Sequence, residues 1–214
     1  TGPGMVTETV SDSDGMVEAG RSISLTAMAQ EGYSFAGWTV NGIKNEQTST
    51  TLALTMNENK TIEARFGRIV TVTTNKDDGN SSLRWAMAQA ENYDIIRFEE
   101  HLANDTIVLT SPLGFDPWLG GGFVSIEGNG ITLSGNNTCL ILSNGSHHLA
   151  LSNLNFVHGY NPEGEGGAIQ NYWGSLTLQS CRFSLNIAKE GGAIFVDFMQ
   201  KKTLTLLSCI FDHN

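Results

Sequence analysis

Hydrophobic and polar residues alternate along the first part of the chain, which is the pattern of strands with one buried face. The segment RSISLTAMA places Ile23 and Leu25 on one face, and TLALTM places Leu52 and Leu54 on one face. Glycine and asparagine turns separate these segments, as in antiparallel sheets. The pattern predicts a small β-rich module over residues 1–67.

A helical pattern follows a short strand, RIVTVTTN, that begins after Gly67. A serine at position 81 or 82 is suited to capping a helix start. The apolar residues then recur at i, i+3, i+4 and i+7: Leu83, Ala86, Met87 and Ala90. This stripe predicts a helix of about three turns. Because a long β-rich stretch follows, we expect the apolar face of the helix to cover an open end of that β-structure.

Three segments of the second half align without gaps: LALSNLNFVHG from Leu149, LTLQSCRFSLN from Leu176 and LTLLSCIFDHN from Leu204. Their starts are separated by 27 and 28 residues. An internal repeat of this length is typical of a solenoid. The spacing predicts that the segments stack as successive circuits of a wide parallel coil, about 4.8 Å apart.

Stacking places like residues over one another. The alignment predicts a phenylalanine column of Phe156, Phe183 and Phe211. It also predicts a column of Leu154, Cys181 and Cys209, and an amide ladder of Asn186 over Asn214. Between the apolar pairs of each repeat lies a three-residue step, where the coil is expected to turn a corner. The two stacked cysteines fall within disulfide range, and a pair of buried thiols is equally compatible with the pattern.

The pentapeptide EGGAI occurs twice, ending at Ile169 and at Ile194. Paired glycines suit a bend with positive φ, or two backbones that approach more closely than side chains allow. We therefore expect these residues to occupy one structural position on successive circuits. The expected repeat positions are Gly166 and Gly191, Gly167 and Gly192, Ala168 and Ala193, and Ile169 and Ile194.

The first part of the chain resembles a known small module. GYSFAGW from Gly32 to Trp38, followed by NKTIEARF from Asn59 to Phe66, is similar to the internalin-type B repeat, also called the Listeria-Bacteroides repeat. The resemblance covers most of residues 5–67. It implies a β-rich unit strung along bacterial surface proteins, usually as a spacer, without catalytic residues.

The tandem GGAI and FxxN tetrapeptides resemble the repeats of the polymorphic outer membrane proteins, a family of autotransporter adhesins best known from chlamydiae. The resemblance covers residues 156–214. More broadly, residues 69–214 resemble the entry region of right-handed parallel β-helix proteins of bacterial surfaces. The chain departs from the repeat at position 159, where glycine stands in place of the expected asparagine.

These resemblances imply an adhesive or structural passenger or stalk of a bacterial cell-surface or secreted protein. They further imply an extracellular location associated with the outer membrane, a role in virulence, and a host receptor, glycan or matrix component as partner. Because the chain begins at Thr1 without methionine, we expect it to be a fragment of a larger protein. Because it stops at Asn214 on the last letter of an FxxN motif, we expect an open sheet edge that continues into further circuits or pairs with another chain.

The patterns together predict an all-β fold. A small β-rich repeat module over residues 1–67 is followed, over residues 68–214, by the N-terminal, helix-capped part of a right-handed parallel β-helix. The net charge of -10 argues against nucleic acid as a partner and against an anionic membrane surface. No apolar run is long enough for membrane insertion, and the histidine and cysteine spacings predict no metal or other cofactor.

Two pairs of residues are candidates for function. Glu165 and Glu190 fall one circuit apart, so their carboxylates are expected about 5 Å from each other, as in a retaining glycosidase. A polysaccharide-active β-helix enzyme, either a lyase or a glycosidase, is therefore the alternative function, although repetition alone also explains the alignment. In the loop FDPWLGGGF, Phe115 and Trp118 are candidates for exposed aromatic residues that bind a partner.

Overall fold

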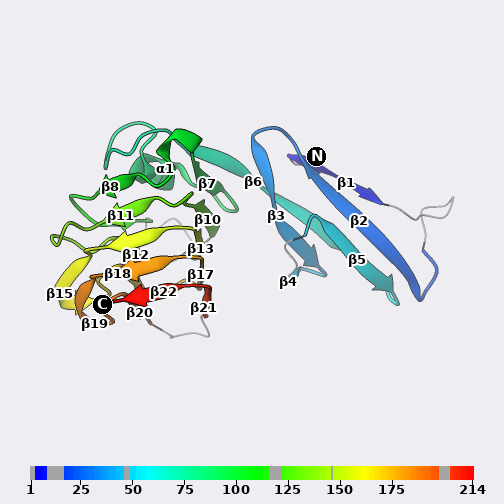
Figure 1. Cartoon of the computed structure of the whole chain (residues 1–214). Helices are drawn as coiled ribbons and strands as arrows, with labels where there is room; N and C mark the ends of the chain where they lie inside the picture. Colours follow the sequence, from blue (N-terminus) through cyan, green and yellow to red (C-terminus); the bar gives the residue numbers. More distant parts are fainter. Residues whose placement is uncertain (1–2, 9–16, 46–48, 116–121, 146, 198–202) are drawn as a thin grey trace. The chain divides into compact units, whose positions relative to one another are not determined.

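The computed structural model describes residues 3–8, 17–45, 49–115, 122–145, 147–197 and 203–214. Most of the described residues lie in strands and few lie in helices, so the predicted all-β class is confirmed. The chain divides into two compact units, Thr1–Ile69 and Val70–Asn214 (Figure 1).

The first unit is built from two sets of antiparallel strands, which belong to two different sheets. One sheet contains, in order, β1 (Gly4–Glu8), β2 (Arg21–Ala29) and β5 (Thr51–Met56). In the other, β3 (Tyr33–Val40) pairs with β4 (Ile43–Asn45) and with β6 (Ile62–Val72), whose last residues belong to the second unit. The core contains the alternating residues Ile23, Leu25 and Leu52 together with Trp38. The Trp38 indole is 1% exposed and donates to the Ser49 carbonyl at 3.0 Å, so this tryptophan serves the core.

The second unit begins with the predicted helix, α1 (Leu83–Gln89), which lies at one end of a coil of strands (Figure 1). Ser82 caps it, because its hydroxyl accepts a hydrogen bond from the Trp85 amide at 3.2 Å. Leu83, Ala86 and Met87 are buried in the core of the coil. The helix is shorter than predicted because Ala90 is already in an extended conformation.

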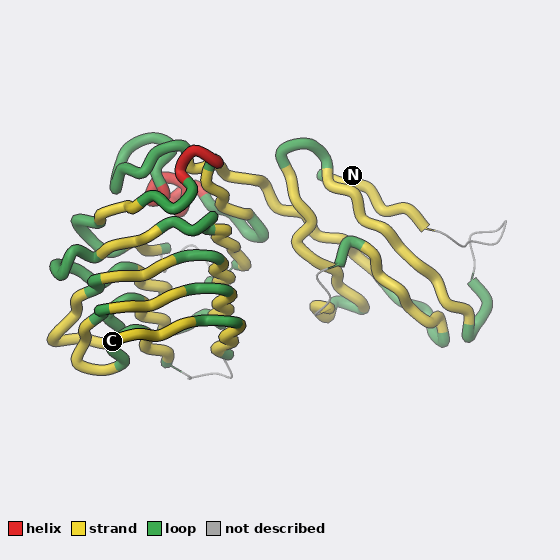
Figure 2. The backbone as a smooth tube through the Cα atoms, in the orientation of Figure 1, coloured by secondary structure: helices red, strands yellow, loops and turns green. Residues whose placement is uncertain are grey.

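The remaining strands form a parallel β-solenoid of about five turns. Figure 2 shows the strands of successive circuits lying one beneath another. The first sheet contains β7 (Ile95–Phe98), β10 (Phe123–Glu127), β13 (His148–Ser152), β17 (Leu176–Gln179) and β21 (Leu204–Leu207). After the 3-10 helix η1 (Glu100–Leu102), the second contains β8 (Thr106–Val108), β11 (Thr132–Ser134), β14 (Asn155–Val157), β18 (Arg182–Ser184) and β22 (Ile210–Asp212).

A third sheet closes each circuit. It contains β9 (Leu113–Gly114), β12 (Leu142–Asn144), β16 (Ile169–Asn171) and β20 (Ile194–Val196). In two circuits an extra strand precedes it, and these strands, β15 (Tyr160–Glu165) and β19 (Ile187–Glu190), pair with each other in parallel.

The register of the sheets confirms the predicted columns. Leu149 pairs with Leu176, which in turn pairs with Leu204. In the neighbouring sheet the Phe183 ring stacks on the rings of the phenylalanines above and below it, with centroid distances of 4.8 and 4.9 Å and interplanar angles of 3° and 7°. Phe183 is 0% exposed, so this ring lies wholly in the core.

The three-residue step of each repeat is the predicted corner. Its middle residue adopts the left-handed conformation in three successive circuits, with φ of 54° at Asn153, 53° at Ser180 and 54° at Ser208. Non-glycine residues in this region are uncommon and cost conformational energy. Backbone hydrogen bonds between successive circuits offset that cost at the corner. They form at each of these corners because the corners share one backbone conformation.

The last described circuit has a neighbour on one side only. β20, β21 and β22 each form the edge of their sheet. Leu206 and Phe211 are consequently 43% and 46% exposed. Pairing of this edge with another strand stays a prediction.

Candidate functional site

The two EGGAI motifs form one corner of the solenoid on successive circuits. The first glycine of each pair has positive φ, 69° at Gly166 and 61° at Gly191. The second glycine permits close stacking, because a Cβ at Gly167 would collide with the backbone carbonyl oxygen of Gly192. Both expected uses of the glycine pair are therefore present, one at each position.

The predicted amide ladder is also present beside this corner. The Asn186 side chain donates to Asn214 Oδ1 at 2.7 Å and to the Phe156 carbonyl at 3.1 Å. Its own Oδ1 accepts from the Gly159 amide at 2.8 Å. Gly159 is the position where the chain departs from FxxN, and a Cβ there would collide with the carbonyl oxygen of Gly167. The departure therefore has a steric cause.

A second amide ladder was not predicted. Asn144 Nδ2 donates to Asn171 Oδ1 at 2.6 Å, and both residues are 0% exposed. Each asparagine also closes the turn that follows it, by donating to the carbonyl of His147 at 2.7 Å or of Gly174 at 2.6 Å. The two asparagines are 27 residues apart, the repeat length, so this spacing was the available signal.

The two glutamates of the EGGAI motifs lie side by side. Glu165 ends β15 and Glu190 ends β19, and the two residues are direct partners in the parallel pair. The Glu165 carboxylate accepts a hydrogen bond from the Tyr172 hydroxyl at 2.7 Å. The register thus brings together the two residues that the sequence singled out, and a catalytic role for them stays a prediction.

A cluster of aromatic and polar side chains adjoins Glu165 on the outside of the solenoid. The Tyr172 hydroxyl accepts from Gln170 Nε2 at 2.9 Å while it donates to Glu165. The hydrogen bond to the Glu165 carboxylate, followed by burial and the negative charge, raises the pKa of Tyr172. The rings of Tyr172 and Phe195 make an edge contact, with centroids 6.0 Å apart. Trp173, the next residue, is 53% exposed.

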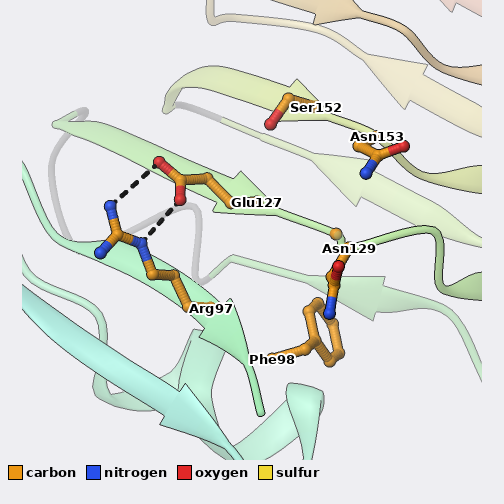
Figure 3. Close-up of a pocket in the computed structure, with 7 residues that line it drawn as sticks. Arg97, Phe98, Glu127, Asn129, Ser152 and Asn153 are labelled. Atoms are coloured by element: carbon orange, nitrogen blue, oxygen red, sulfur yellow. Dashed lines mark hydrogen bonds and ion pairs between the residues drawn. The ribbon is translucent and has the colours of Figure 1, made fainter. Parts of the chain in front are cut away.

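A shallow pocket of about 350 Å³ opens on the first sheet (Figure 3). Arg97 and Glu127, which are register partners on β7 and β10, form an ion pair with Nε–Oε2 and Nη2–Oε1 distances of 2.6 and 3.4 Å. The other lining residues are Phe98, Gly128, Asn129, Ser152 and Asn153. Because Arg97 and Glu127 are paired with each other, the pocket presents polar and apolar surface in about equal amounts.

All three cysteines are free thiols, so of the two arrangements left open by the sequence the thiol pair is present. Cys181 is 1% exposed, and its Sγ lies 3.6 Å from the Leu151 carbonyl oxygen. Burial raises the pKa of the Cys181 thiol to about 11. A thiol held protonated in this way is a poor nucleophile at neutral pH.

The expectation that Phe115 is exposed on a loop is wrong. Phe115 is 6% exposed and its ring packs against that of His147, with centroids 4.6 Å apart. The residue directly follows β9, whose pairing with β12 turns the phenylalanine into the core. Trp118 lies outside the described residues.

Two kinds of site are absent from the described part of the chain. No group of three or more histidine, cysteine, aspartate or glutamate side chains there is arranged to hold a metal ion. Among the same residues, no helix combines the length and the apolar character that a membrane span requires.

Comparison with known proteins finds a similarity that covers the first unit. The family model of the divergent InlB B-repeat domain matches residues 1–70. No curated protein and no solved structure matches the chain. A B-repeat followed by a β-solenoid indicates a bacterial surface-type repeat protein.

Proposed function

We propose that the chain is an adhesive or structural passenger of a bacterial cell-surface or secreted protein. In this proposal the B-repeat unit is a spacer, and the solenoid is a rigid stalk whose outer surface contacts a host receptor, a glycan or a matrix component. The tandem GGAI and FxxN motifs support the more specific proposal of a polymorphic-outer-membrane-type passenger, displayed by an autotransporter at the outer membrane as a virulence factor.

The proposal rests on one observation, namely that the repeated glycines and asparagines hold successive circuits of the solenoid together. The glycines of EGGAI permit close backbone stacking, and the asparagines form buried ladders that satisfy backbone groups at the corners. The repeated residues therefore have a structural role, because they stack each circuit on the next. A stack of this kind needs no ligand for its stability and adds length with each circuit, which suits a stalk.

The test of the adhesive function is attachment of beads that carry the full chain. Beads coated with the chain are expected to attach to epithelial cells or matrix in a saturable way, and the soluble chain is expected to compete. Val108→Ala, which truncates a residue that is 50% exposed on β8, serves as the matched control and should attach equally well. A chain that acts only as a spacer would leave beads no better attached than beads coated with albumin, and that result would refute adhesion.

A polysaccharide-active enzyme is the second candidate, favoured by the direct pairing of Glu165 with Glu190. Most glycosidases use a pair of carboxyl groups that flank the glycosidic bond they cleave. Incubation of the full chain with a broad polysaccharide panel would then release reducing ends or unsaturated sugars, and Glu165→Gln would abolish the release. Absence of release across the panel would refute this candidate.

A further inference from the structure

Among the described tryptophans of the solenoid, Trp85 packs against the core, whereas Trp173 does not. Its side chain is 53% exposed, whereas the neighbours on both sides of its turn, Asn171 and Leu176, are 0% exposed. Burying a large aromatic side chain is one of the main sources of folding energy, so exposure of one leaves that energy available for binding. An exposed tryptophan on a turn is therefore a candidate for contact with a partner.

Other aromatic residues adjoin it. Tyr172 precedes Trp173 on the same turn, and the ring of Phe195 contacts that of Tyr172 edge-on, at 6.0 Å and 67°. Phe195 pairs with Gln170 in the neighbouring circuit, so the cluster spans two stacked strands of the third sheet. We call Tyr172, Trp173 and Phe195, together with Gln170 and Glu165, the Trp173 surface.

The Trp173 surface also carries polar groups beside its rings. Gln170 Nε2, the Tyr172 hydroxyl and the Glu165 carboxylate form a chain of hydrogen bonds of 2.9 and 2.7 Å. A carboxylate has about four acceptor sites, and the tyrosine occupies one of them. Glu165 is partly exposed, so it can accept further hydrogen bonds from a ligand that brings hydroxyl donors.

The turn that holds Tyr172 and Trp173 is built to be rigid. Asn171 closes it by donating to the Gly174 carbonyl at 2.6 Å, and Asn171 is itself held by the amide of Asn144 at 2.6 Å. A Cβ at Gly174 would collide with the carbonyl oxygen of His147, so this turn lies directly against the one above. A ligand therefore meets a preformed surface and the binding costs little ordering entropy.

The charges at this surface restrict the ligand further. Glu165 and Asp197 both act on the Tyr172 hydroxyl, and both are acidic. Glu190 adds a third carboxyl group beside Glu165. Carboxylates repel sulfated or uronate-containing chains, in keeping with the net charge of -10.

We propose that the Trp173 surface binds neutral glycans, whose sugar rings stack on the aromatic residues and whose hydroxyls donate to Glu165. Sugars combine apolar ring faces with many hydroxyl groups, which matches rings flanked by an acceptor. This inference rests on the proposed adhesive function and names the ligand class for it.

The experiment titrates the full chain with neutral oligosaccharides, namely hexaoses of β-linked glucose, of mannose and of galactose. Binding is followed by calorimetry and by tryptophan fluorescence. At least one neutral hexaose is expected to bind the wild-type chain, and Trp173→Ala is expected to weaken it about tenfold or more. Tyr172→Phe keeps the ring and loses the hydroxyl, so a smaller loss is expected.

The matched control is Val108→Ala, which truncates a residue that is 50% exposed on β8, in the second sheet. Val108→Ala should bind the hexaoses like the wild type.

The inference would be overturned by any of three results: binding of no neutral hexaose, equal binding by Trp173→Ala, or binding of sulfated and uronate chains alone. If beads carrying Trp173→Ala still attach to cells under those outcomes, adhesion stands and only the ligand class is wrong. If hexaoses bind through Trp173 but wild-type beads do not attach to cells, adhesion fails and the glycan site stands.

Discussion

Replacing Phe183 by alanine removes the central ring of the phenylalanine column. The ring is 0% exposed and is stacked on both faces, at 4.8 and 4.9 Å. Truncating a buried phenylalanine typically costs about 3–5 kcal/mol, and two stacked neighbours favour the upper part of that range. Phe211, in contrast, is 46% exposed and has one stacked neighbour. Phe211→Ala should therefore cost roughly half as much, about 1.5–2.5 kcal/mol.

Hydrogen exchange is the suitable assay, because the chain has two units and a solenoid can open locally. Amides of β13, β14, β17 and β18 are expected to exchange about a thousandfold faster in Phe183→Ala than in the wild type, because about 1.4 kcal/mol changes the opening equilibrium tenfold. Phe183→Leu, which keeps an apolar side chain, should cost less, and Phe183→Asp should unfold the circuits by burying an unpaired charge. If Phe183→Ala and Phe211→Ala had equal and small effects, the proposed register would be wrong.

Further predictions concern other buried positions. Gly167→Ala should destabilise the solenoid by several kcal/mol, because the new Cβ collides with the backbone of the next circuit. Gly114→Ala is the control and should cost much less, because the nearest atom to its new Cβ is 3.3 Å away. Urea unfolding of the two variants measures the difference in stability. Burial lowers the pKa of His147 below its ordinary value of 6.5, so the unfolded chain takes up the proton first and stability should fall as pH drops below 6.5. His147→Leu should remove that part of the pH dependence. Because burial raises the pKa of Cys181 to about 11, its thiol should resist Ellman's reagent at pH 8 until the chain unfolds. The free energy of unfolding should also fall as pH rises above 9.0, because the unfolded chain loses the thiol proton first. Rapid labelling of the folded chain at Cys181 would contradict the burial.

Residues that repeat at the circuit length were predictable from the sequence. Phe156, Phe183 and Phe211 recur in aligned segments, and like residues stack wherever a coil has a constant length. Asn144 and Asn171 obey the same spacing but lie outside the aligned segments, so their ladder was missed.

Features that depend on one side chain's surroundings were not predictable. Phe115 stands in a glycine-rich stretch that indicates a loop, yet the pairing of β9 fixes its ring in the core. The hydrogen bond of Tyr172 to Glu165 joins residues on either side of a corner, and no periodicity marks it. The repeat alignment predicted the pairing of Glu165 with Glu190, but it did not predict that Tyr172 donates to the Glu165 carboxylate.

The central claim is that EGGAI and FxxN are single positions of a coil repeated on successive circuits, since the stalk and the Trp173 surface both depend on that stacking. The most direct test is a nuclear Overhauser measurement on the full chain with labelled phenylalanine. The ring protons of Phe183 should show cross-peaks to those of both Phe156 and Phe211, which lie 27 and 28 residues away in the sequence. Cross-peaks from Phe183 to neither ring would contradict the stacked circuits and the proposals built on them.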